Sequence, residues 1–414
     1  MSAPSDSFVH PPAELRRHRS FVFYWFARTS SNAAYMMQAV AVGWQIYDLT
    51  GSAFDLGLVG LVQFVPVVVL GLVVGQIADR YDRRRVIAFA QVLKALAAAA
   101  FVAGTLGGWL TRDAMLAILF VSATARAFET PTMHALIPVI VPPVLLPRAI
   151  AAAATANQTA IIGGPALGGI LYMFGANTVY TVCTVVFVLA GALVSLVRLQ
   201  GPPPQKRPVT LDTILAGFRY ILSNRVVLGA ISLDLFAVLL GGVTALLPIY
   251  AKDILETGPW GLGVLRSAPA IGALAVSILL ARRALEHRVG HVLFASVAAF
   301  GLAAIAFALS TSLAVSIAAL AVYGAADAVS VVIRHTLVQT QTPNEMLGRV
   351  TAVNAMFTGT SGTLGEFRAG AVAAMFGAFT SVLAGGIGAV LIAALWMRLF
   401  PEIARIDSIQ GRKP

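Results

Sequence analysis

The chain has 414 residues, of which 58% are hydrophobic and 11% are charged, and its formal net charge is +11. Soluble domains carry about 25% charged residues, so this composition excludes a water-soluble fold and indicates lipid as the solvent for most of the chain. The basic residues lie in short loops between apolar runs, so they do not indicate a nucleic-acid partner. The one cysteine, Cys183, excludes a disulfide within the chain and does not indicate a thiolate metal site.

The first nineteen residues are polar and lack the apolar centre of a secretory signal, so we expect a short cytoplasmic tail at 1–19. Twelve apolar runs follow, each near the ~20 residues that a helix needs to cross a bilayer. They are Phe21–Tyr47, Leu56–Ala78, Val86–Leu110, Met115–Val139, Ala149–Phe174, Thr178–Arg198, Val226–Tyr250, Gly261–Leu280, Val289–Ser310, Leu313–Leu337, Val350–Phe376 and Val382–Leu399. The sequence predicts an all-α integral membrane protein with twelve transmembrane helices.

The loops between these runs differ in charge. The loops after even-numbered runs and the two tails hold most of the 29 Lys and Arg residues, whereas the opposite loops offer little beyond Arg112 and Lys252. The positive-inside rule then places both termini in the cytoplasm, and we expect a multi-pass protein of a bacterial inner membrane.

The longest polar interruption, QGPPPQKRPVTLDT at 200–213, follows the sixth run. Three successive prolines cannot continue a helix, because each ring removes a donor and clashes with the preceding turn. The segment LDTILAGFRYILSN that begins at Leu211 has mostly helical apolar spacing and predicts an amphipathic helix on the inner membrane surface. We expect two six-helix bundles, at 20–198 and 226–399, joined by a linker at 199–225 and followed by a cytoplasmic tail at 400–414.

The two halves resemble each other. A shift of 201 residues aligns Gly164 with Gly365 and Gly169 with Gly370, and HALIPVIVP at 134–142 with HTLVQTQTP at 335–343. A duplicated six-helix unit, which transporters use to form a site between halves, explains this match. A chance match in apolar sequence of low complexity is the alternative.

The stretch GQIADRYDRRR at 75–85 concentrates charge between the second and third runs. It resembles the loop signature of the major facilitator superfamily, Gly-x-Leu-Ala-Asp-Arg-x-Gly-Arg-Arg, although Asp82 replaces the second glycine. The resemblance implies a gate on the cytoplasmic face in which Asp79 faces the start of span eleven. Its residues would be Gly75, Asp79, Arg80, Arg83 and Arg84. The alternative is that these arginines only enforce the topology.

Gly164, Pro165, Gly168 and Gly169 in the fifth run resemble the Gly-Pro-x-x-Gly-Gly element of the superfamily's antiporters. Proline and glycine bend a helix and let a neighbour approach closely. The resemblance implies export, whereas ordinary helix packing is the alternative.

The last third, including GAADAVSVVIRHTLVQTQTPNEMLGRVTAVNAMF and GEFRAG, is similar to the branch that contains transmembrane secretion effectors, macrolide efflux proteins and the enterobactin exporter. The resemblance implies a monomeric secondary exporter of a siderophore- or drug-like molecule, without a cofactor, which exchanges its substrate for protons by alternating access. No Gly-Lys dipeptide of a nucleotide-binding loop occurs, so a primary pump is excluded. Uptake of a sugar or organic acid and a transport-dead receptor are the alternatives.

Charged residues inside spans cost about 2.5–3.5 kcal/mol each, so they should face an aqueous cavity or one another. An antiporter needs a carboxylate that holds a proton when buried and releases it when opened to water or paired with arginine. The candidates for proton coupling are Asp234 and Asp327, then Glu129 and Glu366. Permanent structural ion pairs are the alternative for each.

Arg28, Asn32 and Tyr35 lie on one stripe of the first span, which we expect to face a substrate cavity or to pack on a neighbouring helix. Arg126 can meet Glu129 one turn later, and the repeat aligns Arg126 with Asp327, so Arg126 and Asp327 are expected to face each other across the cavity. Lys94 and Arg266 complete the candidate cavity residues. They favour an anion such as a catecholate siderophore, but cationic macrolides stay open.

The segment GTSG at 359–362 has the Gly-x-Ser-Gly form of intramembrane serine proteases, but no histidine base follows His335. No other nucleophile or metal constellation is present. We therefore expect a transporter with no enzymatic activity, no catalytic residue and no metal site.

Overall fold

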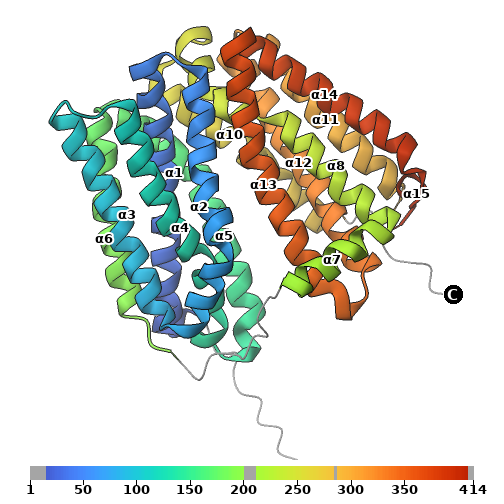
Figure 1. Cartoon of the computed structure of the whole chain (residues 1–414), viewed down its shortest axis with the longest axis horizontal. Coiled ribbons are helices and arrows are strands. Elements are labelled where there is room, and N and C mark those ends of the chain that lie inside the picture. The colour runs from blue at the N-terminus through green and yellow to red at the C-terminus, as the bar shows by residue number, and fades with distance from the viewer. Residues whose placement is uncertain (1–14, 200–210, 284–286, 409–414) are drawn as a thin grey trace, which may run out of the picture.

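The computed structural model describes residues 15–199, 211–283 and 287–408, with the backbone alone for 16, 71–80 and 211–215. Six long helices form the N-terminal half: α1 (Arg19–Thr50), α2 (Ala53–Arg80), α3 (Arg83–Leu106), α4 (Arg112–Ile140), α5 (Leu146–Tyr172) and α6 (Ala176–Ser195). The C-terminal half contains α8 (Arg225–Gly241), α10 (Gly258–Arg282), α11 (Val289–Leu309), α12 (Leu313–Gln341), α13 (Asn344–Phe376) and α14 (Ala378–Leu399). Eleven of the predicted spans each coincide with one of these helices, and the seventh begins with α8, so the predicted all-α fold is confirmed (Figure 1).

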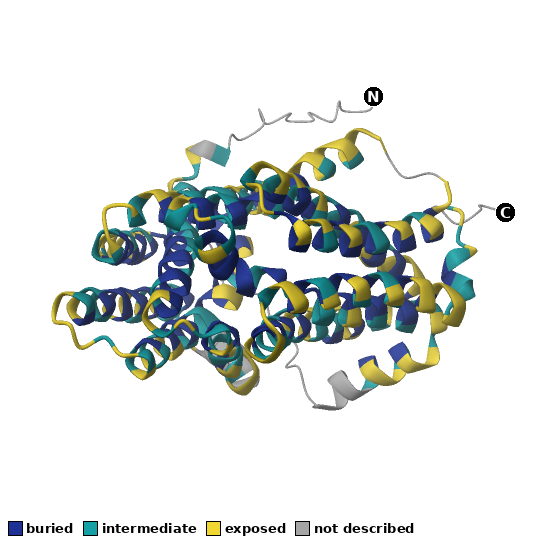
Figure 2. Cartoon of the chain, turned by 90° about the horizontal axis from the view of Figure 1, so that it is seen from above, coloured by how far each residue is buried: buried dark blue, intermediate teal, exposed yellow. Residues whose placement is uncertain are grey.

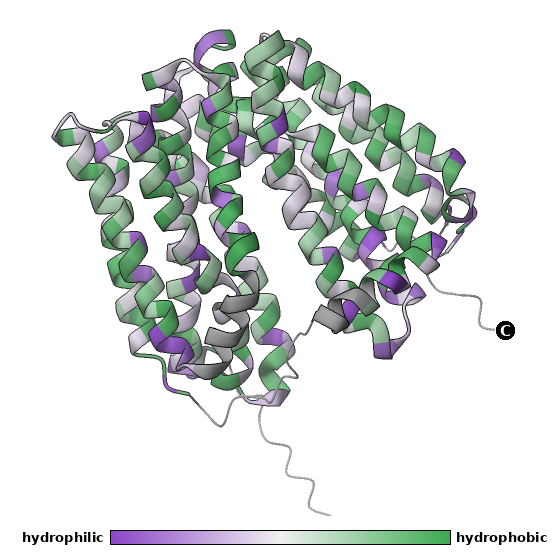
Figure 3. Cartoon of the chain, viewed as in Figure 1, coloured by the Kyte–Doolittle hydropathy of each residue, from purple (hydrophilic) through white to green (hydrophobic). Residues whose placement is uncertain are grey.

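Among the described residues, eight segments are long and apolar enough to cross a membrane, by length and composition alone: α2, α3, α6, α10, α11, α12, α14 and the segment Arg225–Ile254 that begins with α8. The remaining four, α1, α4, α5 and α13, include the helices that carry most of the polar side chains described below. On α3, Phe89, Val92 and Leu96 are all exposed on one face, whereas Lys94 is buried on the other. Such an apolar outer surface suits lipid, and Figures 2 and 3 show buried residues inside and hydrophobic residues outside.

The prediction of one continuous seventh span is wrong. Helix α8 ends at Gly241, and a 3₁₀ turn (Val243–Leu246), the short α9 (Leu247–Ile249) and a π-helical turn (Tyr250–Ile254) complete the crossing. The break lies at Gly242, which has a left-handed φ of 33°. A Cβ on Gly242 would lie 2.5 Å from the carbonyl oxygen of Gly365, so the close approach of α13 also requires glycine there.

The positions matched by the repeat make matching contacts. Gly164 packs against the backbone of α1 at Ala33, and its counterpart Gly365 packs against the backbone of α8 at Val238. Gly169 packs on α10, whereas its counterpart Gly370 packs on α2. Two copies of one structural unit, each contacting the other through the same surface, account for this pattern.

The two bundles meet at one end of the molecule and diverge toward the other (Figure 1). At the meeting end, α5 contacts α10 and α2 contacts α13. Lys252 pairs with Asp48 there, and the Tyr47 hydroxyl donates to Asp253. Helix α7 lies at the diverging end. We call the meeting end, defined by these contacts, the junction.

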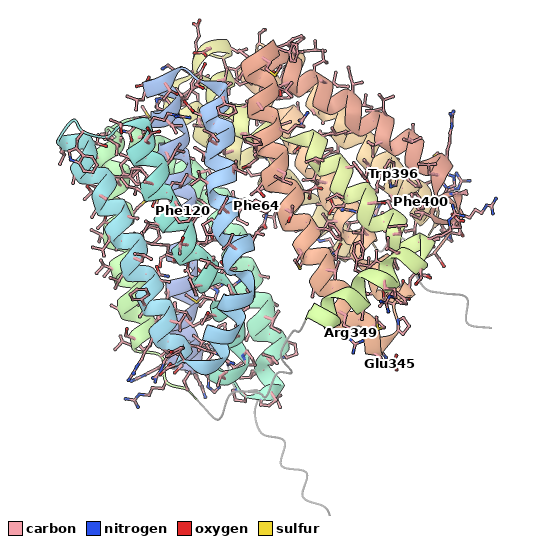
Figure 4. The ribbon with its side chains drawn as sticks, in the orientation of Figure 1. Phe64, Phe120, Glu345, Arg349, Trp396 and Phe400 are labelled. Carbon is pink, nitrogen blue, oxygen red and sulfur yellow. The ribbon has the colours of Figure 1, made fainter. Side chains whose placement is uncertain are left out.

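Helix α7 (Leu211–Ser223) has the expected amphipathic pattern. It also packs on α13 and α8. A Cβ on Gly217 would lie 2.8 Å from the carbonyl oxygen of Arg349, and Ile221 joins a buried cluster with Val350 and Val353. Figure 4 shows Glu345 and Arg349 at the start of α13 beside α7. The apolar face of α7 is therefore covered by α13 at least in part.

The end of α14 and the residues that follow it also pack on the C-terminal half. Trp396 donates from Nε1 to the Ser232 hydroxyl at 2.9 Å, and Phe400 lies next to it at the end of α14 (Figure 4). In α15 (Pro401–Ala404), Ile403 is buried against α11. Asp407 then accepts a hydrogen bond from the Arg288 backbone at 3.0 Å.

Asp82, which departs from the family signature, begins α3. Its carboxylate accepts from the Arg84 backbone N–H at 2.9 Å as an N-cap and pairs with the Arg84 guanidinium at 2.7 Å. The hydrogen bond from the Arg84 side chain holds the pKa of Asp82 below its ordinary value, despite the opposing effect of partial burial.

We expect Gly169→Ala to destabilise the protein. The new Cβ would lie 2.6 Å from the Pro259 carbonyl oxygen and 3.0 Å from the Cα of Gly263, and overpacking of this kind costs about 1–3 kcal/mol. Gly163→Ala is the matched control on the same helix, because nothing lies within 4 Å of its Cβ position. Thermal unfolding of the purified protein in detergent measures both, and a G169A variant that melts at or above the wild-type temperature would contradict this close approach.

Asp82→Ala should cost about 0.5–2 kcal/mol at neutral pH through loss of the N-cap. Because the pKa of Asp82 is lowered in the folded state, its charge stabilises the fold above its unfolded pKa, and this contribution disappears as pH falls through the folded pKa. The gap in stability between wild type and variant should therefore narrow on acidification. Asp82→Asn, which keeps a capping oxygen without the charge, is the control. Thermal unfolding of all three proteins at neutral and at acidic pH measures the difference in stability.

Candidate functional site

Helices α3 and α4 bring a lysine and a carboxylate together inside the N-terminal bundle. Lys94 Nζ lies 2.5 Å from Glu129 Oε2 and 2.6 Å from the Ser31 hydroxyl, and Gln91 donates to Glu129 Oε1 at 2.7 Å. The Lys94 ammonium also lies 4.5 Å from the ring centre of Phe187. Lys94, a predicted cavity residue, is 0% exposed and lies outside the linings of the two cavities described below. Its charge is balanced inside the bundle, as a buried ion requires.

A polar cavity of about 250 Å³ lies beside this network between α1, α4 and α5. It brings together the predicted residues Arg28, Asn32 and Arg126. The lining also includes Glu129, Thr130, Met133, His134 and Asn157. The prediction missed Asn157 and His134 as cavity residues. The polar Asn157 in the alanine-rich run AAAATANQTA was the available signal for the former.

A second cavity of about 310 Å³ adjoins the first and shares Arg28 and His134 with it. The rest of its lining is apolar, from the end of α4 and the start of α5: Ile137, Pro138, Leu146, Ile150, Ala153 and Ala154. We call the first cavity the polar chamber and the second the apolar chamber.

Arg126 lies in the polar chamber and makes no ion pair with an acid among the described residues. Its guanidinium carbon lies 3.8 Å from the ring centre of Tyr35, and Nη1 donates to Asn32 Oδ1 at 3.2 Å. The expected pairing with Glu129 is not formed, because Lys94 holds that carboxylate. Asp327, the expected partner across the centre, lies instead beside Arg334 in the other half.

In the C-terminal bundle, two acids flank one arginine. Arg334 on α12 pairs with Asp234 on α8, and its Nη2 lies 3.9 Å from Asp327 Oδ1. Thr358 on α13 donates to Asp234 at 3.1 Å. The Asp234 side chain is 8% exposed, whereas that of Asp327 is 43% exposed. The pairing of Asp234 and Asp327 with Arg334 was not predicted, although Asp327 and Arg334 are seven residues apart and so share one face of α12.

Glu366 and Arg266 lie at the junction rather than in the polar chamber. Glu366 accepts from the Thr244 hydroxyl at 3.0 Å, and its other carboxylate oxygen lies 3.0 Å from a Cβ built on Gly60 of α2. Arg266 on α10 interacts electrostatically with Glu366 and with Tyr35. These residues therefore connect the two halves where they touch.

The predicted cytoplasmic gate is only partly described. Gly75, Asp79 and Arg80 belong to α2, but their side chains lie outside the described residues. Arg83 donates to the Ala135 carbonyl oxygen at 3.0 Å, and Arg84 donates to that of Val197 at 3.1 Å, both in the N-terminal half. The start of α13, the expected partner of Asp79, packs on α7.

The glycines of the fifth span make close contacts with neighbouring helices. Gly164 and Gly168 let α1 approach α5, Gly169 contacts Gly263 of α10, and α5 runs through Pro165 without interruption. Ser361, from the protease-like tetrad, is buried and donates to the Thr358 carbonyl oxygen at 3.1 Å. It does not line either chamber.

The buried Lys94–Glu129 pair yields a stability prediction. Lys94→Met leaves Glu129 buried and unpaired, which should cost about 3–5 kcal/mol, whereas Lys94→Met combined with Glu129→Leu should recover much of this loss. Arg225→Ala is the control, because its exposed pair with Glu402 is worth at most about 1 kcal/mol. Melting of the detergent-purified variants measures the costs, and a double variant as unstable as the sum of its single changes would argue against a coupled pair.

Comparison with solved structures supports the fold. A bacterial homologue of the human lysosomal transporter Spinster, in an inward-facing, unoccupied conformation, superposes with a TM-score of 0.75 at 15% identity, covering 95% of this chain and 99% of that one. A bacterial homologue of the iron transporter ferroportin has a TM-score of 0.71 at 17% identity, covering 95% and 100%.

Comparison with curated proteins and family models identifies relatives. The enterobactin exporters EntS of Escherichia coli O1:K1 and of Citrobacter koseri are each 29% identical over 401 residues, covering 94% of this chain and 94% of each relative. The model of the transmembrane secretion effectors matches residues 11–412. The chain is thus a multi-pass transporter of a bacterial inner membrane, and it belongs to the transmembrane secretion effector family of the major facilitator superfamily.

Proposed function

We propose that this protein exports a small, siderophore- or drug-like molecule by alternating access. The observation that carries the proposal is the polar chamber, where Arg28, Asn32 and Arg126 gather inside a bundle that otherwise faces lipid. The enterobactin exporters match along nearly the whole chain, and their name supports export over uptake of a sugar or organic acid. A bundle that rocks about the junction would expose the chamber to each side of the membrane in turn.

The loop charges favour both termini in the cytoplasm. With that orientation, the junction is the periplasmic closure, held by Lys252 with Asp48 and by Tyr47 with Asp253. The segments would be a tail at 1–19, bundles at 20–198 and 226–399, a linker at 199–225 and a tail at 400–414. When the junction opens, the loop of Asp79 would close on the start of α13.

Proton antiport is the proposed energy source, with the protein acting as a monomer. Asp234 and Asp327 are the first candidates, because they compete for one guanidinium, that of Arg334. A movement of α12 against α8 that weakened one pair would leave a carboxylate free to take a proton. Glu366 at the junction is the next candidate, whereas Glu129 is held by Lys94.

Efflux from proteoliposomes under an imposed pH gradient, screened over siderophores and antibiotics, tests the proposal. Asp234→Asn and Asp327→Asn should each reduce gradient-driven flux by at least about tenfold, because a neutral amide cannot cycle a proton. Asp113→Asn is the matched control at a surface carboxylate that is 85% exposed. Undiminished flux in both variants would show that neither Asp234 nor Asp327 couples transport to protons. Flux only into the compartment equivalent to the cytoplasm would mean that the protein imports its substrate.

A further inference from the structure

The two chambers together select a chemical class of substrate. The polar chamber contains one acid, Glu129, whose charge Lys94 balances. Arg28 and Arg126 make no ion pair within the described part of the chain: Arg28 bonds to the Tyr24 hydroxyl and His134, and Arg126 to Asn32. Among the described residues, neither of these guanidinium groups has a carboxylate of its own, because Lys94 pairs with Glu129.

The hydrogen bonds of the polar chamber also orient its donors. A guanidinium can only donate, so Asn32 must present Oδ1 to Arg126 and use Nδ2 to donate to Asn157 Oδ1, at 2.7 Å. This leaves the Asn157 amide N–H groups for the chamber. By the same rule, His134 Nε2 accepts from Arg28 Nη2 at 3.3 Å.

We propose that the two chambers bind an amphipathic anion, and this inference rests on the proposed transport function. The acceptor-rich anionic group would lie among Arg28, Arg126 and Asn157 in the polar chamber. Its apolar, ring-sized body would pack on Ile137 and Ile150 in the apolar chamber, which adjoins at Arg28 and His134. A cationic substrate is disfavoured here. Glu129 is the one acid among the described residues that line the polar chamber, and it is already paired with Lys94.

Binding to the full-length protein in phosphatidylcholine nanodiscs tests the class directly. Three probes share one fluorescent body: 4-(1-pyrenyl)butyrate, its methyl ester and the analogous trimethylammonium compound, each titrated against empty nanodiscs as background. The acid should bind at least about tenfold more tightly than the ester and the cation, because only the carboxylate forms charge-assisted hydrogen bonds with the two guanidinium groups. Equal binding of the three, or tightest binding of the cation, would overturn the proposal.

Variants assign the preference to residues. Arg126→Gln and Arg28→Gln should each abolish the preference for acid over ester, whereas Arg282→Gln, an exposed change at the end of α10, should leave it intact. Ile150→Asn should weaken the acid and ester alike. If Arg126→Gln does not fold, Arg28→Gln and Asn157→Leu carry the test. An acid preference that persists in both of these would place the anion elsewhere and contradict the proposal.

Flux of the same probes separates this inference from the proposed function. Selective binding of the acid without any flux in proteoliposomes would leave the anion site standing and remove the transport role of the chambers. Flux of the ester or the cation at the rate of the acid would retain transport and overturn the anion selectivity.

Discussion

The structure depends on one constraint: a charge inside a lipid-embedded bundle must find its partner within the bundle, because no water is available to solvate it. Lys94 satisfies this through Glu129, Ser31 and the ring of Phe187, and Asp234 satisfies it through Arg334 and Thr358. Each of these charges is locked in one half. In the polar chamber, Arg28 and Arg126 have hydrogen-bond acceptors but no ion pair among the described residues. The proposed binding role of the chamber rests on these two charges.

A second constraint, close backbone approach, positions the halves. Gly169 against Gly263 and Gly57 against Gly370 remove the side chains that would hold α5 from α10 and α2 from α13. Without a hydrophobic force between helices in lipid, such small-residue contacts supply the packing. The same contacts concentrate at the junction, so the two bundles are held at one end and are free to diverge at the other (Figure 1). A transporter that rocks needs this division between a tight contact and an open end.

The charged residues inside the bundles form two groups that affect helix movement differently. Charges that are fully paired within one bundle, such as Lys94 with Glu129, hold three or four helices together and would be costly to separate. Charges shared between partners, such as Arg334 with two carboxylates, can change partner at lower cost when helices move. Glu366 and Arg266 belong to neither type, because they lie where one half touches the other and are positioned to respond when the junction opens.

The sequence by itself determined the positions of the long helices and the all-α fold class, because the length of an apolar run is a local property of the chain. It also identified nearly every charged residue inside the spans. Only the tertiary structure decided how these charges pair: Glu129 takes Lys94 instead of Arg126, Asp234 takes Arg334, and Gly242 breaks the seventh span where α13 crosses it. Pairing depends on which faces of separate helices meet, and helical periodicity specifies the face of a residue but not its neighbour on another helix.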